Sequence, residues 1–210
     1  MFTGIVKARL PVVVLDRKAD FALFTMEFSA ELGAGLEIGA SVALNGTCLT
    51  VRSLETLPDG GQRAVFDAIG QTLAVTNLGA VQQGDVVNIE RAARMGDEIG
   101  GHLLSGHVMA QVAVLDVQIT ENNCVVWFER PANLAKYLLD KGYVALNGCS
   151  LTIAEVEEAR FSVHLIPETR DVTTFGLAQV GDAINVEVDP QTQAVVDTVT
   201  RILAERAASE

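Results

Sequence analysis

Small polar side chains that could orient a ligand recur at two places 102 residues apart. Cys48 and Thr50 flank a leucine at the first place, and Ser150 and Thr152 do so at the second. Alternate residues of a strand share one face, so each pair points the same way. One interpretation is a core cysteine among ordinary strand hydroxyls. The other is two equivalent pockets, which indicates that the chain binds two similar ligands.

Two histidines, His102 and His107, lie five residues apart, a spacing that matches no common metal-binding motif. His107 follows Gly106 at the start of an expected strand, where a side chain with a pKa near neutrality could act as an acid or a base. The alternative is a structural histidine at the mouth of a barrel. The sequence has no Walker or Rossmann loop, His-Glu-x-x-His, Cys-x-x-Cys or Gly-x-Ser-x-Gly motif, and we expect no metal site.

The two polar places belong to an internal repeat. Residues 42–50 (VALNGTCLT) and 144–152 (VALNGCSLT) are identical at seven of nine positions. At the same offset of 102, residues 2–8 match residues 104–110, whereas residues 76–79 match residues 173–176 at an offset of 97. The first copy therefore carries five extra residues, which the turn-forming stretch 57–61 accounts for as a longer hairpin loop. One repetition predicts two copies of a domain rather than a solenoid.

Composition limits the class of protein. The 210 residues fit one large domain or two of about 100, and the repeat favours two. A net charge of −12 argues against non-specific binding to nucleic acid or to an anionic membrane. No apolar run approaches the roughly 18 residues of a membrane span. Three cysteines without metal-like spacing favour a reducing, cytoplasmic location.

Short β-like segments separated by turns occur in both copies and predict two small antiparallel barrels. We expect short helices at residues 72–78 and 131–141, the second because Leu134, Tyr137 and Leu138 recur at helical spacing before Gly142. Residues 91–101 form a short linker, so the copies should touch. The expected strands span residues 6–16, 21–28, 41–53 (a pair with a turn at Asn45-Gly46, or one bent strand), 63–69, 85–90, 104–119, 124–129, 161–165 and 183–188.

The pattern changes after Pro190. Residues 191–206 contain no Gly or Pro and place Val195, Val199, Ile202 and Arg206 on one helical face, which Val196 and Leu203 widen. A lone helix with an apolar stripe must bury it. It either docks on its own domain or, the alternative we favour, packs against copies of itself in an oligomer.

Several segments resemble the riboflavin synthase family of the alpha-chain type, from residue 1 to about residue 199. They are MFTGIV (1–6), VALNGTCLTV (42–51), TNLG (76–79), GGH (100–102), SGH (105–107), KG (141–142), SLT (150–152) and LIPET (165–169). The resemblance implies an all-β fold of two tandem six-stranded antiparallel Greek-key barrels that bind lumazine, at residues 1–102 and 103–190. A C-terminal oligomerisation helix at residues 191–210 and a homotrimer are also implied.

The resemblance further implies a four-carbon-unit transferase that needs no cofactor. Two molecules of 6,7-dimethyl-8-ribityllumazine would give riboflavin and 5-amino-6-ribitylaminouracil, the last step of riboflavin biosynthesis. The alternative is a non-catalytic lumazine or flavin carrier, which we disfavour because both copies keep their Leu-Thr strand and their Gly-Ile-Val or Gly-His-Val segment. An association with lumazine synthase, which makes the substrate, stays open.

The resemblance assigns residues to an active site between the first barrel of one subunit and the second barrel of a neighbour. The polar groups nearest the reacting atoms would be Cys48, His107, Ser150 and Asp189. The first pocket would use Gly4, Ile5, Val6, Ser41, Cys48, Leu49, Thr50, Asp67, Ala68, Ile69, Gly70, Gln71 and Thr72. The second would use Gly106, His107, Val108, Lys141, Ser150, Leu151, Thr152, Ile166, Pro167, Glu168, Thr169, Arg170 and Asp171.

Two departures from the family pattern stand out. Gln71 occupies a position where the family usually has Glu, and Asn147 one where it usually has Asp. The amide of Gln71 keeps an acceptor, gains donors and loses the charge. We expect both residues to retune ligand contacts without abolishing catalysis.

Overall fold

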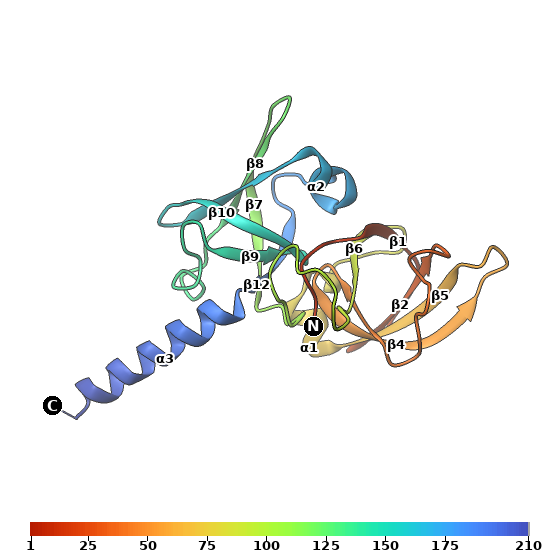
Figure 1. Cartoon of the computed structure of the whole chain (residues 1–210), viewed down its shortest axis with the longest axis horizontal. Helices are drawn as coiled ribbons and strands as arrows, with labels where there is room; N and C mark the ends of the chain where they lie inside the picture. Colours follow the sequence, from red (N-terminus) through yellow and green to blue (C-terminus); the bar gives the residue numbers. More distant parts are fainter. Residues whose placement is uncertain (210) are drawn as a thin grey trace.

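Two closed six-stranded antiparallel barrels and a long C-terminal helix make up the chain, as a computed structural model that describes residues 1–209 shows (Figure 1). The strands close in the order β1-β2-β5-β4-β3-β6 and, equivalently, β7-β8-β11-β10-β9-β12, which confirms the predicted fold. The first barrel contains β1 (Ala8–Arg17), β2 (Phe21–Phe28), β3 (Ser41–Leu44), β4 (Thr47–Thr56), β5 (Gln62–Ile69) and β6 (Val86–Arg91). The second contains β7 (Ala110–Ile119), β8 (Cys124–Glu129), β9 (Tyr143–Leu146), β10 (Cys149–Val156), β11 (Arg160–Leu165) and β12 (Ala183–Val188).

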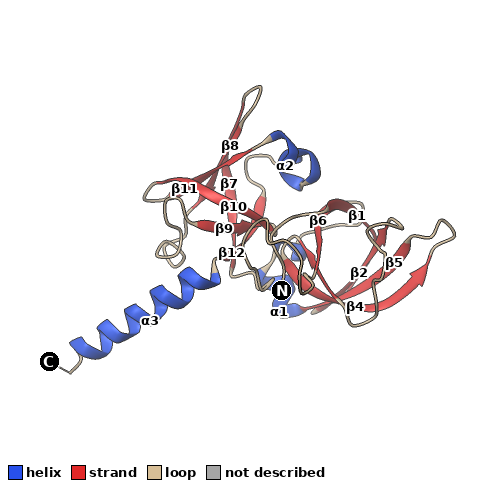
Figure 2. Cartoon of the chain, in the orientation of Figure 1, coloured by secondary structure: helices blue, strands red, loops and turns tan. Residues whose placement is uncertain are grey.

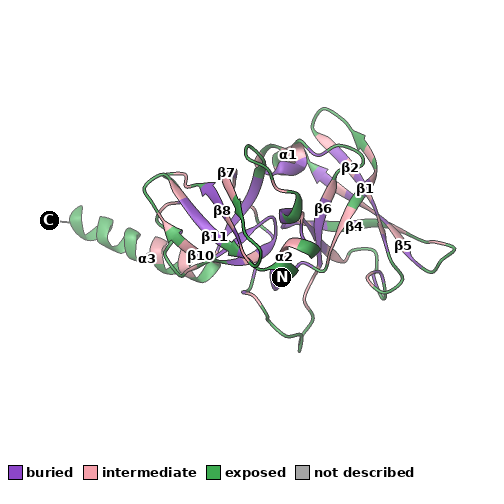
Figure 3. Cartoon of the chain, turned by 90° about the horizontal axis from the view of Figure 1, so that it is seen from above, coloured by how far each residue is buried: buried purple, intermediate pink, exposed green. Residues whose placement is uncertain are grey.

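Each barrel encloses its own apolar core. Strand β2 shows why: Ala22, Phe24, Met26 and Phe28 are buried, whereas the residues between them are partly exposed. This alternation gives each strand one inward face, which lines the barrel (Figure 3). The short helices α1 (Gly70–Val75), η1 (Asn77–Gly79), α2 (Pro167–Val172) and η2 (Thr174–Leu177) follow the fifth strand of each copy (Figure 2).

The predicted hairpin is confirmed. Asn45 and Gly46 form the turn between β3 and β4, with φ angles of 45° and 78° that these two residue types tolerate. Strand β1 contains a bulge, because its pairing with β2 shifts register between Val12 and Val14, close to Pro11. The helix expected at residues 72–78 begins earlier, at Gly70, and ends at Val75 before η1.

The helix predicted over residues 131–141 is wrong, because this stretch forms consecutive turns. Leu134, Tyr137 and Leu138 are buried in the second core, so their spacing reflects a loop that packs inward and not a helix. The Arg130 guanidinium donates to the carbonyl oxygen of Ala135 at 2.8 Å, an acceptor that a continuing helix would need for its own backbone. Similarly, the strand expected from residue 104 begins only at Ala110.

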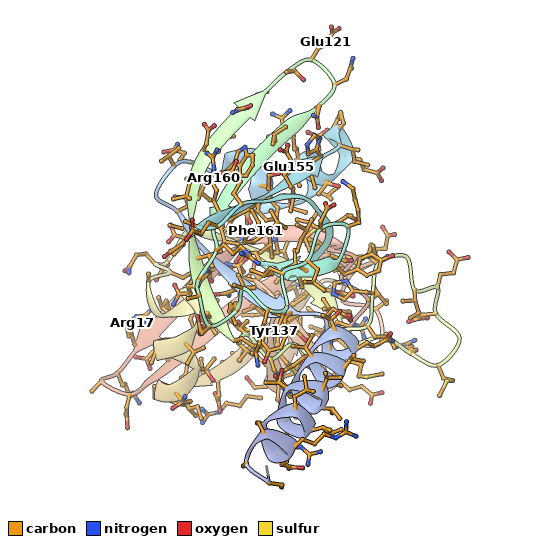
Figure 4. The ribbon with its side chains drawn as sticks, turned by 90° about the vertical axis from the view of Figure 1, so that its left-hand side faces the viewer. Arg17, Glu121, Tyr137, Glu155, Arg160 and Phe161 are labelled. Carbon is orange, nitrogen blue, oxygen red and sulfur yellow. The ribbon has the colours of Figure 1, made fainter. Side chains whose placement is uncertain are left out.

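Helix α3 (Pro190–Ala207) begins at Asp189, whose carboxylate accepts from the Thr192 backbone N–H at 2.9 Å. Its first turns dock on the second barrel, where Tyr137 OH donates to Asp197 at 2.6 Å (Figure 4). Beyond this contact the helix points away from both barrels (Figures 1 and 3). Val195 and Leu203 are about 60 % exposed, so the barrels of the same chain leave the apolar stripe largely uncovered. No helix within residues 1–209 is long and apolar enough to cross a membrane.

Five buried asparagines join the two barrels. The Asn185 side chain accepts from the Asn77 backbone N–H at 2.7 Å and donates to the Asn45 carbonyl at 2.8 Å. The Asn147 side chain accepts from Asn77 Nδ2 and from the Asn185 backbone N–H, and Asn88 Nδ2 donates to the Asn147 carbonyl. The expectation that Asn147 retunes ligand contacts is therefore corrected, because this side chain lies in the seam between the barrels.

We predict that Asn185→Ala destabilises the protein strongly, because it leaves the Asn77 N–H and the Asn45 carbonyl buried without partners. Each such group costs about 1–3 kcal/mol, so the free energy of unfolding should fall by about 2–4 kcal/mol. Urea denaturation measures this. Asn122→Ala, in an exposed turn, is the matched control and should leave the urea midpoint unchanged. Equal midpoints for the two variants would contradict a structural role for the network.

Candidate functional site

The first candidate pocket lies on the outer face of β4 and β5. Along β4, Leu49 and Val51 are buried, whereas Cys48 is partly exposed and Thr50 exposed. The predicted alternation of this strand is therefore correct. A cavity of about 320 Å³ opens beside Cys48 and Thr50 and extends to Asp67, Ile69 and Thr72. Arg52 and Asp67 form an ion pair of 3.0 Å on its wall.

The second candidate pocket is the counterpart of the first. Thr152 and Ala154 on β10 and His164 on β11 line a cavity of about 450 Å³ together with Lys141 and Glu155. The repeat pairs Thr152 with Thr50, Ala154 with Arg52, and His164 with Asp67. Lys141 corresponds to Gly39, and both adopt positive φ angles, 61° and 87°. The two cavities thus share a backbone but carry different side chains at matching positions.

The segment that precedes each barrel in the sequence pairs with a strand of the other barrel. The Gly4 carbonyl accepts from the Ser150 backbone N–H at 2.8 Å, and the Gly106 carbonyl accepts from the Cys48 backbone N–H at 2.9 Å. Phe2 and Leu104 form a reciprocal β-bridge between these segments. The grouping expected from the sequence is therefore wrong: residues 4–6 adjoin the second pocket and residues 106–108 the first.

Two buried glutamates hold these segments in place. Glu90 accepts from Thr3 N at 2.6 Å and from Gly4 N at 3.1 Å, and Glu187 accepts from Ser105 N at 2.7 Å and from Gly106 N at 3.0 Å. Both also accept from the neighbouring Thr3 or Ser105 hydroxyl. Burial raises the pKa of Glu90, and the hydrogen bonds from Thr3 and Gly4 oppose that rise.

The four residues proposed nearest the chemistry separate into two places. Cys48 is a free thiol beside Gly106, and His107 is exposed next to it along the chain. Ser150 lies on β10, and its Oγ is 2.6 Å from Nδ1 of His102, which belongs to the segment between the barrels. Asp189 acts on His102 through its charge, but its oxygens serve the first turn of α3, where they accept from Gln191 and Thr192.

Of the other predicted residues, Leu49, Asp67, Ile69 and Thr72 line the first cavity, and Lys141 and Thr152 line the second. Ser41 pairs with Thr50 across β3 and β4, and Gln71 lies exposed in α1. Lys141 donates to the Ala154 carbonyl at 3.0 Å. The residues with buried side chains, which can offer a ligand only backbone groups, are Val6, Leu49, Ala68 and Leu151. The segment from Ile166 to Asp171 forms the N-cap and first turns of α2, as Ile69 to Thr72 do for α1.

Sequence reasoning missed three features of the site. His102 was considered only as a metal ligand, yet it bonds to Ser150. Glu90 and Glu187 were unremarked, although both occupy the same place in Asn-x-Glu of the repeat and could have been found there. His164 entered the site only through the cavity that it lines.

We predict that Gly106→Ala destabilises the protein by more than about 1 kcal/mol. Gly106 has a φ of +79°, and an added Cβ would lie 2.6 Å from Cys48 Cβ. Gly84→Ala is the matched control, because Gly84 has a φ of +94° with open space around it and so isolates the backbone cost. Thermal unfolding should rank Gly106→Ala below Gly84→Ala. The reverse order would mean that the close approach to Cys48 is not tight.

Comparison with known proteins gives a consistent result. The model of the lumazine binding domain matches residues 3–92 and again residues 105–189. Riboflavin synthase of Escherichia coli (strain K12) is 49 % identical over 207 residues, which cover 98 % of this chain and 95 % of that protein. Riboflavin synthase of Mycobacterium bovis is 42 % identical, covering 90 % of this chain and 93 % of its own length.

Solved structures share the fold. LumP complexed with riboflavin superposes with a TM-score of 0.81 at 23 % identity, covering 90 % of this chain and 99 % of that one. LumP complexed with 6,7-dimethyl-8-(1'-D-ribityl) lumazine gives a TM-score of 0.79. Two lumazine-binding repeats, a shared fold and near full-length similarity to curated enzymes lead to one conclusion: the chain belongs to the riboflavin synthase family.

Proposed function

We propose that this chain converts two molecules of 6,7-dimethyl-8-ribityllumazine into riboflavin and 5-amino-6-ribitylaminouracil by moving a four-carbon unit from one to the other. The observation that carries the proposal is the duplicated cavity, together with full-length similarity to curated riboflavin synthases. The reaction joins two like substrates. Two equivalent binding surfaces suit it, because positioning them against each other can supply much of the rate.

In the proposed roles, one lumazine lies on the outer face of β4 and β5, and the other lies on the outer face of β10 and β11. The first pocket takes its ligand between Cys48–Thr50 of β4, the stretch 67–72 and the crossing segment 106–108. The second uses Ser150–Thr152 of β10, Lys141, the stretch 166–171 and the crossing segment 4–6. Polar side chains at the cavity rims, such as Asp67 and Lys141, can pair with ribityl hydroxyls, and this would disfavour ligands that lack them.

We propose a homotrimer in which the first pocket of one subunit faces the second pocket of a neighbour. The uncovered apolar stripe of α3 supports this, since Val195, Val199 and Leu203 are at least half exposed in the single chain. A cytoplasmic location is supported by the three free cysteines.

The reaction predicts a fixed stoichiometry. Purified protein mixed with 6,7-dimethyl-8-ribityllumazine, without added metal or cofactor, should consume two lumazines for each riboflavin formed. Absorbance and fluorescence follow both species in one assay. Tight binding of lumazine that is recovered unchanged would instead identify a carrier protein and overturn the proposed reaction.

The trimer predicts that a charge in the stripe of α3 disrupts assembly. Val199→Glu should yield monomers at micromolar concentration in sedimentation velocity and lower riboflavin formation, because an unpaired charge is costly to bury. Ala204→Glu adds the same charge on the opposite, exposed face of α3 and should keep the assembly of the unmodified chain. An oligomeric, fully active Val199→Glu protein would contradict this role of the helix.

A further inference from the structure

The C-terminal helix α3 touches its own barrel over a short stretch only (Figure 1). Val196 is partly buried against the core of the second barrel, and the Asp197 side chain is hydrogen-bonded there. Every described residue after Asp197 is exposed. Apart from the bonds of the cap residue Asp189, the hydrogen bonds that join α3 to the rest of residues 1–209 all end on Asp197. The direction in which the helix leaves the barrel therefore depends largely on this one side chain.

Two donors from one loop meet at this carboxylate. Lys136 Nζ and Tyr137 Oη each lie 2.6 Å from the same oxygen, Asp197 Oδ1. Hydrogen bonds from Lys136 and Tyr137 lower the pKa of Asp197, so the carboxylate is ionised at neutral pH and both bonds are charge-assisted. An exposed ion pair contributes little by itself, but Tyr137 is 6 % exposed and gives its bond a fixed geometry. We call Lys136, Tyr137 and Asp197 the helix clamp.

The loop that supplies both donors is itself held firmly. Leu134 and Leu138, on either side of the donors, are buried in the second core, and the Arg130 guanidinium donates to the Ala135 carbonyl at 2.8 Å. The same loop ends at Lys141, which lines the second candidate pocket. The helix clamp therefore ties α3 to the part of the second barrel that carries this pocket.

The helix clamp lies on the side of α3 away from its apolar stripe. At about 100° per residue, Asp197 lies about 160° around the helix axis from both Val195 and Val199. The clamp therefore holds one side of the helix to the barrel and leaves the stripe uncovered. The helix continues over residues 198–207, a length of about 15 Å, so a tilt of about 10° at Asp197 would move its far end by roughly 3 Å.

We propose that Asp197 is a positioning residue that, held by Lys136 and Tyr137, sets the angle of α3 and so aligns the second pocket of one subunit with the first pocket of a neighbour. This proposal rests on the proposed function, in which two lumazines react across that boundary. Each lumazine binds to the pocket of one chain. Transfer of the four-carbon unit needs both pockets in the right relative position, and a misplacement of about 1 Å can lower a rate by about 100-fold.

Asp197→Ala tests the proposal, because it removes the helix clamp and leaves the apolar stripe intact. We expect a kcat about 10-fold lower, lumazine affinity within about two-fold and an unchanged mass in sedimentation velocity. Tyr137→Phe removes one of the two bonds, so it should lower kcat less, and it should have no further effect in an Asp197→Ala background. Glu205→Ala is the matched control, because Glu205 pairs with Arg201 within α3, and its kcat should equal that of the unmodified protein.

Three kinetic outcomes would overturn the proposal. The first is a kcat for Asp197→Ala equal to that of Glu205→Ala. The second is a parallel loss of lumazine affinity, which would mean that the loop ending at Lys141 has moved and has altered the second pocket itself. The third is a loss of kcat that disappears at higher protein concentration, which would mean that the helix clamp only strengthens assembly.

Small-angle X-ray scattering separates this proposal from the proposed reaction, because it needs no turnover. At constant mass, Asp197→Ala should broaden the distribution of interatomic distances, since the second barrel is no longer held at one angle to α3. The curve of Glu205→Ala should superimpose on that of the unmodified protein. Superimposable curves for Asp197→Ala and the unmodified protein would refute the positioning role even in an active enzyme. The broadened distribution in a protein that leaves lumazine unchanged would refute the reaction alone.

Discussion

Two buried carboxylates, Glu90 and Glu187, organise the structure around them. A carboxylate in a protein interior is costly unless N–H and O–H groups surround it, and each of these finds three donors in the residues that lead into its own copy. Those residues are thereby held in a backbone path that requires glycine, with φ of +74° at Gly4 and +79° at Gly106. Along this path the Gly4 carbonyl reaches Ser150 on β10 of the second barrel, and the Gly106 carbonyl reaches Cys48 on β4 of the first.

Much of this architecture was predictable because it depends on local pattern. The alternation of Cys48, Leu49 and Thr50 places side chains on two faces of a strand whatever the partner strand is, and the Asn45-Gly46 turn requires only tolerance of positive φ. Because of the repeat, the same alternation and the same turn are expected again in the second copy. The resemblance supplied the family, which periodicity alone could not name.

What failed depends on contacts between distant residues. The spacing of Leu134, Tyr137 and Leu138 fits a helix, but Arg130 takes a backbone acceptor from it and the loop packs inward. The exchange of residues 4–6 and 106–108 between the barrels could not be predicted from the repeat. The repeat shows only that these two segments are equivalent, and it assigns each of them to the copy that follows it in the sequence. The position of Asn147 could not be read from its type, since an amide suits a pocket and a buried seam equally well.

The two candidate pockets show how the copies of a duplicated scaffold diverge. Backbone geometry is conserved between them, whereas the side chains diverge at the rim: the Arg52–Asp67 pair of the first becomes Ala154 and His164 in the second, and Gly39 becomes Lys141. Exposed pairs of this kind contribute little to stability, so they are free to change with the ligand. The side chains that point into each barrel form its apolar core, so they have no such freedom to change.

The reciprocal contacts between the copies also carry a historical meaning. Phe2 pairs with Leu104, Gly46 approaches Gly148, and each copy supplies a glycine carbonyl to the other, which is the pattern of an isologous interface between identical subunits. A single ancestral repeat with these residues would have found the same partners in a second molecule. Gene duplication and fusion then needed to add only a connection as short as residues 91–101 between the barrels, and once the halves were joined in one gene, each was free to evolve its own pocket.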